Sequence, residues 1–213
     1  YQDENKKWLS PDEIETEDGK KFFVKGNPNK TVNVGPSESM SKSKRNTIDP
    51  EQMIKSYGAD AVRLFILSDS PPEKDVQWSE QGMAAAYKFV QKFWTLNTKI
   101  LEKINGSSDN KNLEANLELE KYTNQLINKV NINLSKFNYN VIIANMHETY
   151  NFLFKLIEKE ISKNSLKENY KKILTIFSPI LPHLIFECLE KLNYKVFQKW
   201  PEVDKKMISE ETI

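Results

Sequence analysis

A short loop at residues 39–49 brings together side chains of the types that can bind phosphate groups. It reads Ser-Met-Ser-Lys-Ser-Lys-Arg-Asn-Thr-Ile-Asp, so three cations and three serines stand close together. Asp49 is a good N-cap and Pro50 suits the first position of a helix. Lysines on a loop that leads into the positive end of a helix stabilise phosphate oxygens. The pattern favours chemistry on a phosphorylated ligand, with a plain solvated basic loop as the alternative.

Helical patterns follow this loop at once and must hold it in place. Residues 50–57 predict a short helix that ends at Gly58, and residues 59–67 predict a second one. Pro71 and Pro72 then break the chain. Five further helices are predicted, with Ser79 and Asn140 as N-caps, over residues 79–104, 114–136, 140–161, 165–177 and 182–191. A loop is expected at 105–110, and the short connections predict an antiparallel bundle.

The segment before the loop, residues 1–34, is polar and rich in turn residues. Asp18-Gly19 predicts a hairpin turn beside a short strand at 21–25, and Gly26-Asn27-Pro28-Asn29 predicts another turn. Trp8 and Leu9 are the other sizeable anchors. We expect this segment to be an insertion that rests on a larger body, or a truncated edge.

Composition excludes several classes of protein. Of 213 residues, 38% are apolar and 29% charged, which suits a helix-rich protein. The net charge of +1 gives no global basic field, so contacts with nucleic acid must come from local patches. One cysteine, Cys188, excludes an internal disulfide, fits a reducing compartment and is expected to be a buried thiol. No apolar run reaches the length of a membrane span, and the start at Tyr1 predicts a piece of a longer protein.

Other candidate side chains have ordinary structural interpretations. Aromatic residues at helical spacing are expected in the core rather than as base-stacking platforms: Phe89, Phe93, Trp94, Phe152 and Phe154. His147 is expected to be capped or at the surface, and His183 to form a local hydrogen bond, rather than to bind metal. Glu187 and Glu190 are expected to be exposed rather than an acid/base pair. No metal site is predicted.

Several runs in the chain resemble a known family. Met40-Ser41-Lys42-Ser43 resembles the Lys-Met-Ser-Lys-Ser signature of class I aminoacyl-tRNA synthetases, with Ser39 in place of the first lysine. Residues 57–63, Tyr-Gly-Ala-Asp-Ala-Val-Arg, are similar to the run that follows this signature in the synthetases for leucine, valine, isoleucine and methionine.

Further runs favour the leucyl-tRNA synthetases among these. They are Ser43-Lys44-Arg45-Asn46, Ser70-Pro71, residues 76–82, Pro179-Ile180-Leu181-Pro182-His183 with Glu187, and Trp200-Pro201 with Asp204. Residues 8–14, Trp-Leu-Ser-Pro-Asp-Glu-Ile, resemble the start of the leucine-specific insertion of bacterial-type enzymes. The resemblance runs in order from residue 8 to about residue 204.

The resemblance implies roles for the loop. Five residues would surround the ATP phosphates, namely Ser39, Met40, Ser41, Lys42 and Ser43, and Lys42 would stabilise charge on the departing pyrophosphate. Lys44 and Arg45 would contact phosphate or tRNA. Mg²⁺ would arrive on the nucleotide and would not be held by this chain.

The resemblance also implies the fold and the partners. We expect a mainly α protein, in which a short α+β segment with a β-hairpin and the loop precedes an antiparallel helix bundle. The expected domains are the leucine-specific insertion at 1–34, the loop and stem-contact helices at 35–78, the anticodon-binding bundle at 79–204, and a linker at 205–213 to a further domain.

The implied protein activates leucine with ATP and transfers it to tRNA(Leu). It would be a cytoplasmic monomer that contacts tRNA backbone rather than the anticodon bases. Candidate contacts are the lysines at 121, 129, 136, 171 and 172. The His-x-Gly-His signature that pairs with the loop is missing, so a partner half of the ATP site is expected upstream and this piece alone is expected to be inactive.

Two alternatives stay open. One is a related synthetase fragment, for valine, isoleucine or methionine, against which Lys44-Arg45 and residues 78–82 argue. The other is a free-standing helical tRNA-binding or assembly module in which the loop is a relic. Ser39 in place of a lysine supports this second alternative.

Overall fold

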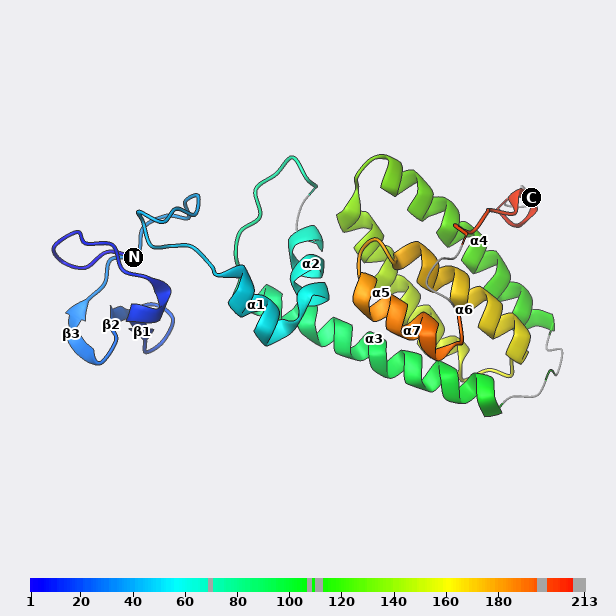
Figure 1. The fold of residues 1–213 in the computed structure, drawn as a ribbon. Coiled ribbons are helices and arrows are strands. Elements are labelled where there is room, and N and C mark those ends of the chain that lie inside the picture. Colours follow the sequence, from blue (N-terminus) through cyan, green and yellow to red (C-terminus); the bar gives the residue numbers. More distant parts are fainter. Residues whose placement is uncertain (69–70, 107–108, 110–112, 195–198, 209–213) are drawn as a thin grey trace. The chain divides into compact units, whose positions relative to one another are not determined.

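The chain folds into a small mixed unit followed by a helical unit (Figure 1). The computed structural model describes residues 1–68, 71–106, 109, 113–194 and 199–208. Two compact units, Tyr1–Ser56 and Tyr57–Ile213, are each described by themselves. The architecture is mainly α with a small sheet, so the predicted fold class is confirmed. The predicted domain boundaries stay predictions.

The first unit contains a three-stranded antiparallel sheet in the order β1-β2-β3. A 3-10 turn at Pro11–Glu13 leads into β1 (Ile14–Thr16), β2 (Phe22–Val24) and β3 (Asn27–Thr31). The predicted hairpin is confirmed: Ile14 pairs with Val24, Gly19 has a φ of +72°, and the Asp18 carboxylate accepts hydrogen bonds from the backbone N–H groups of Lys20 and Lys21.

Strand β3 was not predicted from the sequence, since its first residues read as a turn. The chain already reverses direction at Gly26, between β2 and β3, where the φ of +70° favours glycine. Pro28 lacks a backbone N–H but lies on an edge strand, where it is tolerated. Among the described residues of this unit only Leu9 and Val32 are buried, so the segment has almost no core of its own, as expected.

Seven α-helices lie in the described part of the chain. The short α1 (Pro50–Tyr57) directly follows the candidate loop, and the rest are α2 (Ala59–Ser68), α3 (Glu80–Gly106), α4 (Leu113–Ser135), α5 (Tyr139–Leu156), α6 (Lys163–Phe177) and α7 (Pro182–Lys191). Helix α6 packs against α3, α4 and α7, while α2 packs on α3, α5 and α7 (Figure 1). One continuous apolar core runs through this second unit.

The ends of most helices follow local sequence signals. Gly58 has a φ of +82° between α1 and α2, and the Ser79 hydroxyl accepts a hydrogen bond from the Gly82 N–H at 3.1 Å. Both predictions are confirmed. The predicted break at 68–72 and loop at 105–110 lie partly outside the described residues, as does the tail at 205–213, and α3 itself extends to Gly106.

The prediction of Asn140 as an N-cap was wrong, because α5 begins one residue earlier. Helix α4 ends in a left-handed turn at Phe137, with a φ of +56°. The Asn138 N–H there donates to the Asn133 carbonyl at 2.9 Å, closing the last turn of α4. Asn138 is therefore the residue that leads into α5, and Asn140 lies within the helix. Helix α5 also ends earlier than predicted, at Leu156.

The core contains a few polar groups of defined environment. Cys188 is fully buried, as predicted, and desolvation raises the pKa of its thiol to about 12. The Tyr170 hydroxyl donates to the buried Asn97 side chain at 3.1 Å, and burial raises the tyrosine pKa well above its usual value. Within the described residues, no helix combines the length and apolar character needed to cross a membrane.

Candidate functional site

The candidate loop is a turn braced by one asparagine. The Asn46 side chain accepts a hydrogen bond from the Ser41 N–H at 2.7 Å and donates one to the Ser39 carbonyl at 3.4 Å. The Arg45 N–H donates to the Lys42 carbonyl at 3.2 Å, and Arg45 has a φ of +53°. The Ser41 hydroxyl also accepts from the Lys44 N–H. These bonds present the side chain of Lys42 at the corner of the turn.

The three cations of the loop have different surroundings. Lys44 forms an ion pair with Glu38, and its ammonium lies 5.9 Å from the centre of the Trp8 ring. Arg45 pairs with Glu13 at 2.9 Å. Lys42 is exposed and has no partner among the residues that the structure describes. Of the three, Lys42 is therefore the one ready to meet an incoming anion.

Glu13 connects the loop to the segment that precedes the sheet. Its carboxylate accepts from the Ser10 N–H at 2.9 Å and from the Ser10 hydroxyl at 3.1 Å. The Ser10 backbone N–H, and beyond it the Ser10 hydroxyl and the Arg45 guanidinium, lower the pKa of Glu13 below its usual value. Residues 8–14 and the loop are thus in contact, a pairing that sequence reasoning missed because opposite charges 32 positions apart give no local signal.

Asp60 on α2 holds the beginning of α7. Its buried carboxylate accepts hydrogen bonds from the Leu184 N–H at 2.6 Å and from the His183 N–H at 3.4 Å, and its Oδ1 lies 2.9 Å from His183 Nδ1. The prediction that His183 bonds locally was wrong. Leu181, the N-cap residue of α7, has no side chain that can accept a hydrogen bond, so the acceptor comes from 123 residues away.

Arg63, one turn further along α2, binds the chain between α6 and α7. Its guanidinium donates to the carbonyls of Pro179 at 2.7 Å and Ile180 at 3.1 Å. Residues 57–63 and 179–183 therefore form one joint between α2 and the end of the bundle. Both runs were noticed in the sequence, and only the structure shows that they are partners.

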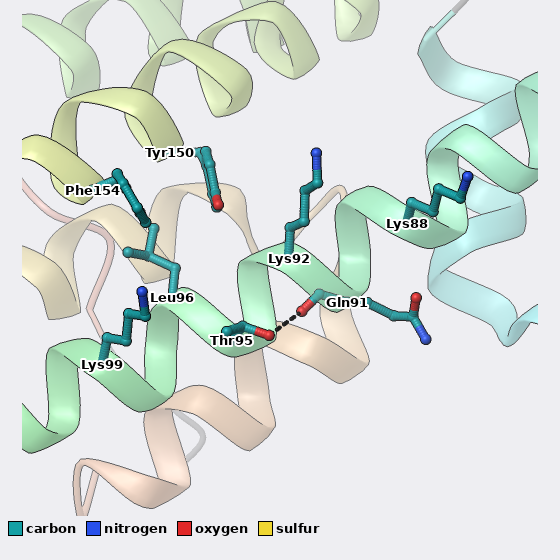
Figure 2. Close-up of a pocket in the computed structure, with 8 residues that line it drawn as sticks. All are labelled: Lys88, Gln91, Lys92, Thr95, Leu96, Lys99, Tyr150 and Phe154. Carbon is teal, nitrogen blue, oxygen red and sulfur yellow. Dashed lines mark hydrogen bonds between the residues drawn. The ribbon is translucent and has the colours of Figure 1, made fainter.

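The aromatic side chains divide between core and surface. Phe89 and Phe93 are buried, and Phe152 stacks on Tyr122 with ring centres 3.8 Å apart, in agreement with the prediction. The prediction was wrong for two others, which are partly exposed: Trp94 at 36% and Phe154 at 41%. Phe154 lines a hollow between α3 and α5 (Figure 2).

The titratable candidates outside the loop show no catalytic arrangement. Glu187 and Glu190 are exposed, as predicted. His147 lies against Phe89 with ring centres 4.0 Å apart, and desolvation, helped by the nearby Lys92, lowers its pKa. No group of three or more His, Cys, Asp or Glu side chains able to hold a metal ion occurs among the described residues.

The candidate lysines on α4 and α6 also differ in exposure. Lys121, Lys129 and Lys136 are exposed. Lys171 lies 3.7 Å from the centre of the Tyr194 ring, and Lys172 is partly buried.

Comparisons with known proteins agree with the geometry of both units. Residues 31–79, which contain the loop, match the family "tRNA synthetases class I (I, L, M and V)". Residues 116–213 match "Anticodon-binding domain of tRNA ligase". The leucine–tRNA ligase of Bartonella quintana is 39% identical over 96% of this chain, and that of Rickettsia bellii is 38% identical over all of it.

A solved structure shows the same fold. It is a LeuRS–tRNA–LeuAMS ternary complex from Agrobacterium radiobacter, which superposes with a TM-score of 0.72 at 24% identity over 81% of this chain and 23% of that one. The two matched families, over residues 31–79 and 116–213, identify the chain as a part of a class I aminoacyl-tRNA synthetase. Within this class the chain belongs to the leucine–tRNA ligase family, and it spans about a quarter of the length of the relatives it matches.

Proposed function

We propose that this chain is the part of a leucine–tRNA ligase that closes on ATP and holds tRNA. The complete protein would join leucine to ATP, releasing pyrophosphate, and would then pass the leucyl group from leucyl-adenylate to the 3′ end of tRNA(Leu), releasing AMP. The observation that carries the proposal is Lys42, exposed and without a partner among the described residues, at the corner of a braced turn in a chain of this family.

Lys42 would act on the leaving group of the first step. When the leucine carboxylate attacks the α-phosphorus, the bond to the bridging oxygen breaks and negative charge grows on the pyrophosphate. A lysine ammonium placed against those oxygens stabilises the transition state more than the ground state. The hydroxyls of Ser41 and Ser43, 3.2 Å apart, would supply further donors to the phosphates.

The rest of the loop would position these donors. Asn46 fixes the backbone on either side of Met40, which is itself exposed. The Ser39 carbonyl accepts a hydrogen bond from Asn46, so the Ser39 backbone helps to fix the conformation of the loop. The Ser39 hydroxyl would then be the group that contacts phosphate at the position where the family pattern has lysine. Mg²⁺ would come with the nucleotide and shield the phosphates from one another.

Lys44 and Arg45 would be secondary phosphate or tRNA contacts. Both are engaged in surface ion pairs, with Glu38 and Glu13. Such pairs contribute about 0–1 kcal/mol, so a phosphate can replace the carboxylates with little loss. The partners of the complete protein would be ATP, leucine and tRNA(Leu), and it would work in the cytoplasm as a monomer.

The test is leucine-dependent exchange between ATP and pyrophosphate by the complete protein that contains this chain. We expect Lys42→Ala to lower the exchange rate by about 2–4 kcal/mol of transition-state energy, or roughly 30- to 1000-fold. Lys55→Ala is the matched control, because Lys55 is an exposed lysine on α1 paired with Glu51 within its own helix. The 213-residue chain alone is expected to give no exchange.

Three outcomes would change the proposal. An exchange rate near that of the unaltered protein in Lys42→Ala would remove Lys42 from the mechanism. Exchange with another amino acid would keep the class and overturn leucine. No exchange with any amino acid, in a folded complete protein, would favour a helical tRNA-binding module, which the partial signature at Ser39 also fits.

A further inference from the structure

A hollow of about 320 Å³ lies on the surface of the helical unit between α3 and α5. Figure 2 shows its two sides: Tyr150 and Phe154 reach over α3 from α5, and lysine side chains rise from α3 beside them. The buried Leu96 lies beneath. The volume is at the lower end of the range for small-molecule sites, which suits a single nucleobase rather than a whole cofactor.

The two aromatic rings form a ledge. The rings of Tyr150 and Phe154 are nearly parallel, at 19°, with centres 6.1 Å apart. Phe154 is 41% exposed, although most of the apolar side chains of α5 are buried. The Tyr150 hydroxyl has no hydrogen-bond partner in the described part of the chain. An exposed ring with a free hydroxyl beside it suits a flat ligand with polar edges.

The charge of the hollow has one sign. Lys88, Lys92 and Lys99 line it, and no acidic side chain is among its described lining residues. From Lys88 to Lys99 the helix rises by about 16 Å, enough to reach the phosphates on both sides of one nucleotide. An apolar peptide would leave three lysines facing it without compensation. The complementary ligand is therefore polyanionic and aromatic, which describes a nucleic acid strand with an unstacked base.

The present partner of Phe154 can give way to such a ligand. The Lys99 ammonium lies 4.9 Å from the centre of the Phe154 ring. A cation over an exposed ring contributes less free energy than a stacked nucleobase does. When a base stacks on the ring, Lys99 is released towards the phosphate. The Thr95 hydroxyl does not compete, because it donates to the Gln91 carbonyl of its own helix at 3.1 Å (Figure 2).

We propose that this hollow holds one unpaired nucleotide of the tRNA. The base stacks on the ledge of Tyr150 and Phe154, and the flanking phosphates bind Lys88, Lys92 and Lys99. The inference rests on the proposed function, since it takes the tRNA as its partner. Stacking accepts any base because every base has a flat face, so the site anchors the tRNA without reading its sequence.

The experiment measures the affinity of the complete protein for fluorescently labelled tRNA(Leu) across a range of salt concentrations. We expect Phe154→Leu, which keeps an apolar side chain but removes the ring, to weaken binding about tenfold. Phe154→Tyr keeps the ring and should bind as the unaltered protein does. Phe186→Leu is the matched control, because Phe186 is a partly exposed phenylalanine on α7, outside the hollow.

The phosphate contacts are tested in the same assay. Lys92→Ala should reduce the slope of affinity against salt by about 1, while Lys121→Ala, an exposed lysine on α4, should leave it unchanged. A short single-stranded RNA should compete for the site in the unaltered protein, and a duplex of equal charge should not. In Phe154→Leu this preference for the single strand should disappear.

The outcomes separate this inference from the proposed function, because leucine-dependent pyrophosphate exchange needs no tRNA. Normal exchange together with normal tRNA binding in Phe154→Leu overturns the inference and leaves the proposed function standing. Equal competition by single strand and duplex also overturns it, in favour of a purely electrostatic surface. If the unaltered protein shows no leucine-dependent pyrophosphate exchange, that result counts against the proposed function instead.

Discussion

Removing the Asp60 carboxylate should loosen the attachment of α7 to α2. In Asp60→Ala, the Leu184 N–H, bonded at 2.6 Å, and the His183 ring nitrogen, at 2.9 Å, both lose their partner. A hydrogen bond to a charged group contributes about 1.5–3 kcal/mol, and the loss of an N-cap costs about 0.5–2 kcal/mol.

The net effect is smaller than the sum of these contributions. Asp60 is 6% exposed, so desolvation of its carboxylate in the folded state already offsets part of the gain. The His183 side chain is 75% exposed and can bond to water when its partner is gone, whereas Leu184 is 8% exposed and its N–H cannot. We therefore expect Asp60→Ala to lower the free energy of unfolding by about 2–4 kcal/mol. Asp60→Asn keeps one acceptor oxygen and should lose about 1–2 kcal/mol.

The assay is urea unfolding of the chain followed by far-UV circular dichroism. With an m-value of about 2 kcal/mol/M, the midpoint should fall by roughly 1–2 M in Asp60→Ala. Glu187→Ala is the control, because that exposed glutamate of α7 pairs with Lys191, one turn away on the same helix, and should change stability by less than about 0.5 kcal/mol. Ordinary surface substitutions change the free energy of unfolding by up to about 0.5 kcal/mol. If Asp60→Ala changes it by no more than that, the contacts between α2 and α7 do not contribute the stability assigned to them.

Two further changes test the packing of α3. Gly82→Ala would place a Cβ 2.7 Å from the buried Phe65 ring, and the resulting overpacking should exceed the gain in helix propensity, leaving the chain about 1 kcal/mol less stable in urea unfolding; a more stable variant would show that the ring moves freely. His147 has a lowered pKa in the folded state, so at pH values near and below 6.5 the unfolded chain binds the proton more readily than the folded chain does. The free energy of unfolding should therefore decrease as the pH decreases. In His147→Gln that part of the decline in the unfolding midpoint should be missing, and an unchanged pH profile would contradict the environment described for this histidine.

Most of the helices could be predicted from the sequence, because local residue signals mark where they begin and end. Gly58 can adopt the left-handed conformation between α1 and α2, and the hydroxyl of Ser79 is the natural acceptor for the first turn of α3. Cys188, predicted to be a buried thiol, is fully buried. The loop around Lys42 could be recognised because its chemistry is contained in a few consecutive residues.

Local reasoning failed where a partner lies far away along the chain or where packing selects among similar residues. Phe93 and Phe154 follow the same helical spacing, yet one is fully buried and the other faces the hollow between α3 and α5. Which face of a helix stays uncovered depends on the neighbouring helices, and no period in the sequence records that. The start of α5 shifted from Asn140 because the closing turn of α4 uses Asn138.

The sequence by itself predicted a phosphate-binding loop ahead of a helical bundle, and the bundle is confirmed. Only the tertiary structure decided which of the three loop cations has no partner in the described part of the chain, because the carboxylates of Glu13 and Glu38 reach Arg45 and Lys44 through folding. It also decided that Asp60 completes the first turn of α7, 123 residues away. Hydrogen bonds and ion pairs depend on distance in space, and separation along the chain does not reveal that distance until the helices have packed.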